Sequence, residues 1–497
     1  MKKKMLAVLF LVALVFPLFA GGNRQQSGGS AGQTAGSNPV LTLTSMYYSA
    51  EVPETQALTA KMQEITGYRI DITWIPTGAY GDKFNTMLAS DTLTHMAIPN
   101  DLKSSPYLNA VDDGLFWALN DYIKDYPNLV KIGDARYNNV KRNGNIMGIP
   151  RGRDLVRQGV IYRQDWAEDL GFRDQPETFE EIDRMVRGFA ARPETRYGIV
   201  MGCAGTNPAV SYGVNFLAMF LGAPQNYGYN KAGQFTHAWL TDEYTRAVEQ
   251  WRNWYADGLV NRNFIEITGE DAKKILNTEE AGLVFEYTDD IQNRFNDLYI
   301  KNPNARLWYA MRINSITFGT TGFNASIAIS KTAVKDETLL RHCLSFIDGL
   351  GNPEWQTVIG IGLEGEHYTI VDGYAVQNDQ QNAKYAATAN QYGQVNCFQG
   401  IVMNPIPFKR IPAIEAMSDE RLKYADTCVM DPTIPFVSPT AVMIGVSDLD
   451  PIRCDAINKY IMGTINKAEY QAAQRQWLDA GGVRVTREFE EQLRANR

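Results

Sequence analysis

The chain has 497 residues, with 48 Lys and Arg against 56 Asp and Glu, so its formal net charge is −8. Nucleic-acid binding needs a basic field, and this acidic balance argues against nucleic acid as a partner. A chain of this length exceeds what one hydrophobic core supports, so two or more lobes are expected.

The N-terminus has the pattern of an export signal. Lys2 to Lys4 precede an apolar run, Leu6–Leu18, that is too short to span a bilayer. We therefore predict a signal peptide over residues 1–20 and a flexible linker rich in Gly, Ser and Gln over residues 21–39. Removing the three lysines would leave 45 basic residues against 56 acidic ones, a net charge of −11.

No lipid anchor is expected. A thioether-linked lipid needs a cysteine directly after the apolar run, but Gly21 and Gly22 stand there and the first cysteine is Cys203. The mature protein is therefore expected in the periplasm or secreted. The five cysteines show no CxxC spacing, which argues against a zinc site, while one or two disulfides stay open in an oxidising compartment.

Strands and helices alternate after the linker. The patterns predict strands over 40–46, 68–75 and 94–98, with a helix over 54–66 and a second one carrying Tyr80, Phe84, Met87 and Leu88. This order predicts an α/β fold with a mostly parallel, doubly wound sheet. Ligands of such sheets bind beyond the carboxyl ends of the strands.

The second half of the chain follows Gly148-Ile-Pro150 and has the same texture. Thr178 and Glu181 form a capping box for a helix, and a further amphipathic helix over 241–257 stops at Gly258. Further strands are predicted over 160–162, 282–286 and 326–330, and helices dominate the tail over 450–493.

Short motifs in a fixed order carry a family resemblance from about residue 40 to 493. They are Leu119-Asn-Asp-Tyr-Ile123, Asn145-Ile-Met-Gly-Ile-Pro150, Tyr162-Arg-Gln-Asp-Trp166, Trp254-Tyr255 with Asp257-Gly-Leu-Val260, and Gly362-Leu-Glu-Gly365 with His367-Tyr368 and Asp372-Gly373. In this order they resemble family 1 extracellular solute-binding proteins of ABC importers, in particular the LplA-like branch.

The resemblance implies a two-lobed periplasmic-binding-protein fold of type II-like form, with a helical C-terminal tail. Each lobe would be a mostly parallel sheet flanked by helices, with the chain crossing between lobes near 150, 318 and 365. Lobe 1 is expected over 40–150 plus 318–364, and lobe 2 over 151–317 plus 365–497. Closure about the hinge would capture a ligand for a membrane permease.

The candidate ligand contacts follow from the chemistry of a sugar. Aromatic rings cover its apolar C–H face, and charged or amide side chains satisfy its hydroxyl rim. The chain has 25 Tyr, 21 Phe and 9 Trp, so most rings are core and their location must discriminate. The residues expected to contact ligand are Tyr47, Tyr48, Trp74, Arg151, Arg153, Tyr287, Asp289 and Phe323.

The reasons for selecting these residues differ. Most follow a predicted strand or the hinge-like Gly-Ile-Pro, and the resemblance places an aromatic residue near Tyr287 and Phe323. Trp74 shares its strand face with Ile70 and Ile72, which favours core packing. An ion pair between lobes or a solvated charge is the alternative for the two arginines.

Catalytic motifs are weak. Gly360-Ile-Gly-Leu-Glu-Gly365 matches GxGxxG, but a predicted strand follows it where a dinucleotide site needs a helix. The four histidines have no metal-binding spacing, and no cofactor is expected. We therefore expect a non-enzymatic binding protein that delivers a small polar ligand, a sugar or an oligosaccharide, to an ABC permease. The alternatives are a peptide or sugar-acid binding protein, which Arg151 and Arg153 would suit, and a periplasmic glycan-active enzyme.

Overall fold

The computed structural model describes residues 38–496 except Asn100, 205–211, Asn293, 402–411 and Gly445. The chain divides into two compact units, Met1–Asn38 and Pro39–Arg497, and every described helix and strand belongs to the second. The predicted signal peptide and nearly all of the predicted linker lie outside the described residues. No helix in the described part of the chain combines the length and apolar composition that a membrane crossing requires.

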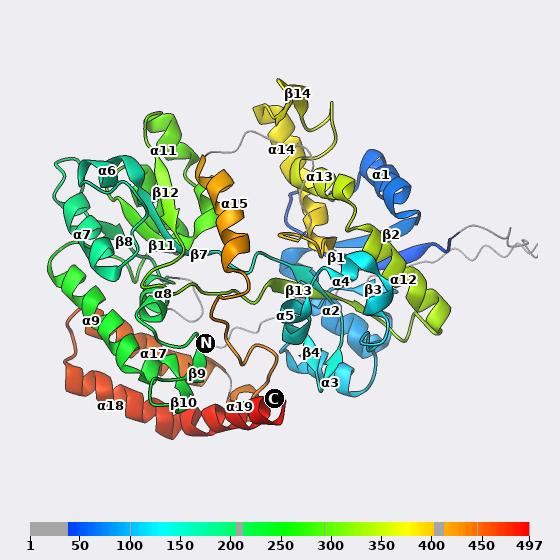
Figure 1. Cartoon of the computed structure of the whole chain (residues 1–497). Coiled ribbons are helices and arrows are strands. Elements are labelled where there is room, and N and C mark those ends of the chain that lie inside the picture. The colour runs from blue at the N-terminus through cyan, green and yellow to red at the C-terminus, as the bar shows by residue number, and fades with distance from the viewer. Residues whose placement is uncertain are drawn as a thin grey trace, which may run out of the picture. The chain divides into compact units, whose positions relative to one another are not determined.

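The first sheet has five strands in the order β2-β1-β3-β13-β6 (Figure 1). Its strands are β1 (Leu41–Tyr47), β2 (Ile70–Pro76), β3 (Met96–Ala97), β6 (Ile149–Gly152) and β13 (Phe323–Ile329). β1 runs parallel to β2 and β3, whereas β13 pairs antiparallel with β3 and β6.

Helices and small hairpins accompany this sheet. They are α1 (Gln56–Thr66), α2 (Thr77–Ser90), α3 (Ser105–Asp112), η1 (Ile123–Asp125), α4 (Pro127–Val130), α5 (Asp134–Asn139), β4 (Lys141–Arg142), β5 (Asn145–Ile146), α12 (Glu337–Gly349), α13 (Pro353–Ile361), β14 (Thr369–Val371), β15 (Tyr374–Val376), α14 (Asp379–Ala387) and η4 (Ala389–Val395). The predicted first helix is confirmed: the Thr55 side chain accepts from the N–H of Leu58, and Gly67 ends the helix at φ 75°.

The second sheet has four strands in the order β12-β7-β11-β8. They are β7 (Gln158–Arg163), β8 (Ile199–Val200), β11 (Leu283–Tyr287) and β12 (Leu307–Ala310). The other elements before residue 302 are α6 (Gln164–Asp169), α7 (Phe179–Ala190), α8 (Tyr212–Phe220), β9 (Tyr227–Tyr229), β10 (Phe235–His237), η2 (Ala238–Leu240), α9 (Asp242–Ala256), α10 (Gly269–Asn277), η3 (Thr288–Gln292) and α11 (Asn296–Lys301).

The predicted helical tail is confirmed. Its helices are α15 (Pro412–Tyr424), α16 (Pro439–Ile444), α17 (Val446–Ile461), α18 (Lys467–Trp477), η5 (Leu478–Gly482) and α19 (Val483–Ala495). The capping box of Thr178 and Glu181 is also present at the start of α7.

The prediction of mostly parallel sheets is wrong, because both sheets are mixed. β7 pairs antiparallel with β11 and β12, and β8 runs parallel to β11. The chain leaves the first sheet after β6 and returns to it as β13, which runs against β3 and β6. Such a return strand needs no crossover helix.

Each sheet has its own hydrophobic core. The first core draws on residues 41–149 and 325–398. The second sheet has one cluster over 160–318 with 449–489 and another over 156–311 with Ala413 and Met417. We call the first sheet with its core lobe 1, and the second sheet with its cores lobe 2.

The boundary predicted at residue 365 is corrected by core membership. Tyr392 and Phe398 are buried in the core of lobe 1, where the Tyr392 ring meets Trp74 and Trp355 edge to face at 5.2 and 5.8 Å. Ala413 already belongs to lobe 2. The third crossing therefore falls after Phe398 and before Ala413, and β14, β15, α14 and η4 stay with lobe 1.

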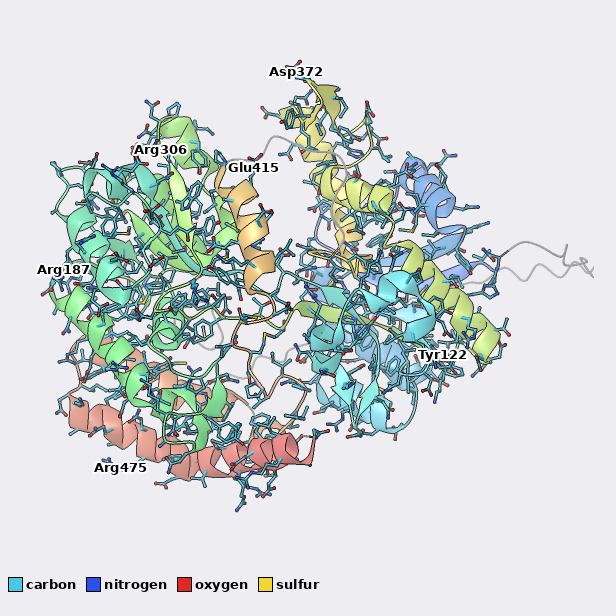
Figure 2. All side chains as sticks on the ribbon, viewed as in Figure 1. Tyr122, Arg187, Arg306, Asp372, Glu415 and Arg475 are labelled. Atoms are coloured by element: carbon cyan, nitrogen blue, oxygen red, sulfur yellow. The ribbon has the colours of Figure 1, made fainter. Side chains whose placement is uncertain are left out.

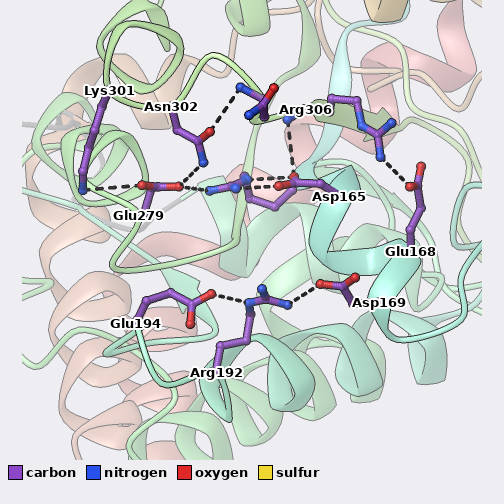
Figure 3. Close-up of polar contacts among 11 residues, drawn as sticks. Asp165, Glu168, Asp169, Arg192, Glu194, Glu279, Lys301, Asn302 and Arg306 are labelled. Carbon is purple, nitrogen blue, oxygen red and sulfur yellow. Dashed lines mark hydrogen bonds and ion pairs between the residues drawn. The ribbon is translucent and has the colours of Figure 1, made fainter.

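One buried cation in lobe 2 shows how this protein ordinarily neutralises such groups. The side chain of Arg163 is 1% exposed and ion-paired with Asp165 at 2.6 Å and with Glu279 at 3.0 Å. Its guanidinium also stacks over Trp166 at 4.2 Å. Figure 3 shows Asp165 and Glu279 within this polar network. The charge is buried but fully paired, as low-dielectric surroundings require.

Candidate functional site

The candidate site surrounds the segment Arg153–Arg157, which joins β6 of lobe 1 to β7 of lobe 2. Tyr47 and Tyr48 stand at the carboxyl end of β1. Tyr47 is 9% exposed and belongs to the packed edge of the sheet, whereas Tyr48 is 60% exposed. The backbone N–H of Tyr48 donates to Oε1 of Gln391 at 2.8 Å, which fixes this strand end against η4.

Arg151 lies near the end of β6 and is 1% exposed. Its Nη2 donates to Oε1 of Gln394 at 2.6 Å and to the carbonyl of Gly393 at 3.4 Å. Its Nε is buried without a hydrogen-bond partner in the described part of the chain. Burial, helped by the charge of Arg153, lowers the pKa of Arg151 to about 10.

Arg153 is half-buried, two residues further along. Its Nη1 donates to the carbonyl of Gly152 at 2.9 Å, and its backbone N–H donates to the carbonyl of Gly322 at 2.8 Å. Burial and the charge of Arg157 lower the pKa of Arg153 below its ordinary value. Tyr48 lies close enough to influence the titration of both Arg151 and Arg153.

An ion-pair network ties the crossing segment to lobe 2. Arg157 grips Asp289 with two hydrogen bonds, from Nε at 3.1 Å and from Nη2 at 2.7 Å. Arg421 of α15 lies 3.0 Å from Asp154 and 3.1 Å from Asp289. Asp289 therefore holds two arginines, so its carboxylate is already engaged by the protein.

The pKa of Asp289 reports on this network. Burial alone would raise it, but the charges of Arg157 and Arg421 outweigh burial and hold the pKa of Asp289 below its ordinary value. The network therefore stabilises the fold above the unfolded carboxyl pKa of about 3.9 and loses this contribution as the pH falls through the depressed value.

Replacing Asp289 with asparagine tests this linkage. We expect Asp289→Asn to lower the free energy of unfolding by about 1–3 kcal/mol at pH 7, because two partly buried guanidiniums lose their anion. The difference between the variant and the parent should shrink as the pH falls through the depressed pKa of Asp289. Denaturant unfolding at pH 7 and at acid pH measures this, with Asp372→Asn as a control in the exposed turn between β14 and β15 (Figure 2). An equal loss at both pH values would contradict the assignment.

Aromatic rings line the lobe 2 side of the network. The guanidinium of Arg157 stacks over the ring of Tyr287 at 4.7 Å. Tyr212, at the start of α8, meets the same ring edge to face at 5.4 Å and is 45% exposed. Tyr287 itself is half-buried, and burial raises its pKa to about 12. These rings present an exposed apolar surface beside charged donors.

Trp74 and Phe323 lie at the edge of lobe 1, and both pack against its core. The Trp74 indole stands edge to face on Tyr392, and its Nε1 is buried without a hydrogen-bond partner among the described residues. Phe323 begins β13 opposite Gly152 and is half-buried. Trp74 therefore packs against the core of lobe 1, as expected from the strand face that it shares with Ile70 and Ile72.

Sequence reasoning missed four members of this site: Asp154, Arg157, Tyr212 and Arg421. The spacing of arginines at 151, 153 and 157 was a usable signal for Arg157. The place of Tyr212 after β8 obeys the same strand-end rule that selected Tyr48. Nothing local in the sequence links Arg421 to Asp154, because 267 positions separate them.

Three surface pockets of about 280, 220 and 560 Å³ lie elsewhere, and none is lined by the eight predicted residues. The first lies beside Tyr227, Phe318 and Met430. In the described part of the chain, no group of three or more His, Cys, Asp or Glu is placed to hold a metal ion. Cys343 and Cys397 are buried and Cys428 is half-buried, and none of these three takes part in a disulfide.

The family model described as "Bacterial extracellular solute-binding protein" matches residues 49–357, more than half of the chain. The chain belongs to this family. This solute-binding protein thus acts outside the cytoplasm, within a family of binding proteins rather than enzymes.

Two relatives from Bacillus subtilis (strain 168) match this solute-binding protein along its length. Lipoprotein LipO is 26% identical over 98% of each chain. The polygalacturonan/rhamnogalacturonan-binding protein YtcQ is 25% identical over 99% of this chain and 98% of its own. The first cysteine in this sequence is Cys203.

Solved structures share the fold. The N-glycan transport solute-binding protein NgtS from Streptococcus pneumoniae superposes with a TM-score of 0.64 at 15% identity, covering 93% of this chain and 100% of that one. At this identity the likeness shows the fold alone.

Proposed function

We propose that this solute-binding protein captures an oligosaccharide between its two lobes and delivers it, chemically unchanged, to an ABC permease. The observation that carries the proposal is the set of side chains around the crossing segment. Aromatic rings come from both lobes: the exposed Tyr48 from lobe 1, and the exposed Tyr212 with the half-buried Tyr287 from lobe 2. Arg153 and Arg157 lie along the segment that connects them.

This combination suits a sugar. A pyranose ring presents apolar C–H faces to aromatic rings and hydroxyls to guanidinium donors. The relative YtcQ is named for binding polygalacturonan and rhamnogalacturonan, and NgtS is named for N-glycan transport. Both names support a carbohydrate as the ligand class of this chain.

Capture by closure follows from the connections between the lobes. The core assignments leave the segments 150–155 and 319–324, with the chain between Phe398 and Ala413, as the connections between the two lobes. A few backbone dihedrals in such segments can rotate one lobe against the other. The ligand stabilises the closed state to the extent that it binds this state more tightly than the open one. A permease would then recognise the closed state.

The finer location also follows from the sequence. Because no cysteine follows the N-terminal apolar run, we place the mature protein in the periplasm or outside the cell without a lipid anchor. A glycan-active enzyme on the same scaffold is the competing function, and it differs in returning shortened products.

A thermal-shift screen of the purified protein tests the proposal. The panel contains neutral oligosaccharides, acidic oligosaccharides, peptides and organic acids. At 100 times its dissociation constant, a ligand that binds only the folded state adds about 2.7 kcal/mol of stability, and the melting temperature rises accordingly. We expect a shift from oligosaccharides alone, with the sugar recovered intact by chromatography. Shifts from peptides only, or shortened sugars, would contradict the proposal.

Replacing Tyr48 with alanine should weaken binding of the best oligosaccharide about 5-fold, because one stacking surface worth about 1 kcal/mol is lost. Tyr48 is 60% exposed, so the fold should not change. Tyr374→Ala, on the exposed hairpin of β14 and β15, is the matched control at 46% exposure. Calorimetric titration measures both, and an equal effect of the two substitutions would remove Tyr48 from the site.

A further inference from the structure

We propose that the bound oligosaccharide carries a carboxylate, as a uronic acid does, and that Arg153 binds this carboxylate in front of the buried charge of Arg151. The inference rests on the proposed function and names the ligand class of the same site.

Arg151 departs from the way this protein treats its other buried cations. Arg163 is as deeply buried and has two carboxylate partners. Lys273, 5% exposed, has Glu270, Glu286 and Asp290 as partners. Arg151 has no ion pair with any carboxylate in the described part of the chain, and its donors meet only a carbonyl and a side-chain amide. Burying a cation without an anion costs several kcal/mol.

The side chains around Arg151 also carry more positive than negative charge. Among the described side chains, the electrostatic contacts and ion pairs of the crossing segment involve five guanidinium groups and two carboxylates, an excess of three positive charges. The groups are Arg136, Arg151, Arg153, Arg157 and Arg421 against Asp154 and Asp289.

Arg153 is the arginine of this cluster whose guanidinium N–H groups are best able to bind a ligand. Arg157 and Arg421 are engaged by Asp289 and Asp154, and Arg136 donates to three backbone carbonyls. Arg153 makes one side-chain hydrogen bond, to the neighbouring carbonyl of Gly152, and no ion pair among the described residues. Its planar fork matches a carboxylate bidentately.

The arrangement also explains the placing of Tyr48. An exposed ring beside Arg151 and Arg153 can cover the apolar face of a sugar while the guanidinium takes its carboxylate. An anionic ligand would supply the charge that the cluster lacks, so its contacts strengthen as closure removes water.

Calorimetric titration at low salt with matched probes tests the inference. The probes are trigalacturonate, its fully methyl-esterified form, neutral maltotriose and triglutamate. We expect trigalacturonate to bind at least 100-fold more tightly than its ester. Because this comparison uses the unaltered protein, it does not depend on any variant folding. If trigalacturonate and its ester bind with equal affinity, the inference is overturned but the proposed function stands. The same holds if neutral maltotriose is the tightest ligand. Tighter binding of triglutamate, or no binding of any sugar, overturns both.

Variants locate the carboxylate contact. Arg153→Gln should weaken trigalacturonate binding about 100-fold and leave ester binding unchanged, since a charge-assisted pair is lost. Arg153→Lys should restore only part of the affinity, because it keeps the charge without the fork. Arg475→Gln removes the same charge from exposed α18 (Figure 2) and should change neither affinity. A loss from Arg153→Gln that is equal for acid and ester would show that Arg153 does not bind the carboxylate.

Discussion

Replacing Arg163 with methionine is expected to lower the free energy of unfolding by about 3–5 kcal/mol, whereas the same replacement of Arg151 should cost little or even stabilise the protein. Both side chains are 1% exposed, so the lost burial is similar. Removing Arg163 leaves Asp165 and Glu279 without their cation, and breaking a buried pair costs about that much. Removing Arg151 relieves a buried charge that no carboxylate among the described side chains offsets.

Denaturant unfolding at pH 7 measures both variants. The account also requires Arg151→Met to bind trigalacturonate more weakly than the parent, so that a gain or null effect in stability accompanies a loss in binding. Equal destabilisation by the two substitutions would mean that the bonds of Arg151 to Gln394 and Gly393 satisfy its charge. The role of Arg151 in ligand binding would then lose its support.

Replacing Gly152 with alanine should lower the free energy of unfolding by about 2–3 kcal/mol and weaken oligosaccharide binding at least 10-fold. A Cβ there would stand 2.5 Å from the carbonyl oxygen of Cys397 and 3.2 Å from that of Gln399, both backbone atoms that cannot swing away. Gly152 lies between the two arginines of the site and pairs through its N–H with Cys397. Forcing these segments apart displaces Arg151 and Arg153 together.

Gly78→Ala provides the matched control for this prediction. Gly78 lies in α2, and a Cβ there meets no atom within 4 Å. Alanine in a helix should therefore be neutral or stabilise by up to about 1 kcal/mol. Denaturant unfolding and titration with the best oligosaccharide check both variants. An unchanged affinity for Gly152→Ala would place the ligand away from this crossing.

Local patterns in the sequence predicted much of the fold. The alternation in β2 and the cap and stop residues of α1, Thr55 and Gly67, are local signals that survive folding. Strand direction is not local: β13 joins lobe 1 antiparallel because the chain returns from lobe 2. The third crossing was misplaced because Tyr392 and Phe398 are buried by contacts with residues about 40 to 320 positions away.

The candidate site also contains residues that the sequence could predict and contacts that it could not. Tyr48, Arg153 and Tyr287 follow strand ends or the hinge-like Gly-Ile-Pro, which a sequence pattern can reveal. The burial of Arg151 depends on η4, and the engagement of Asp289 depends on α15, neither of which has a local signature. Only the structure shows which arginines have a carboxylate partner and which do not.

A crystal structure of the complex with the oligosaccharide that gives the largest thermal shift would show where the ligand binds. We expect an intact sugar in contact with Tyr48 and Arg153 on one side and with Tyr287 on the other. A sugar bound instead beside Tyr227 and Phe318, or recovered as cleaved fragments, would contradict this expectation.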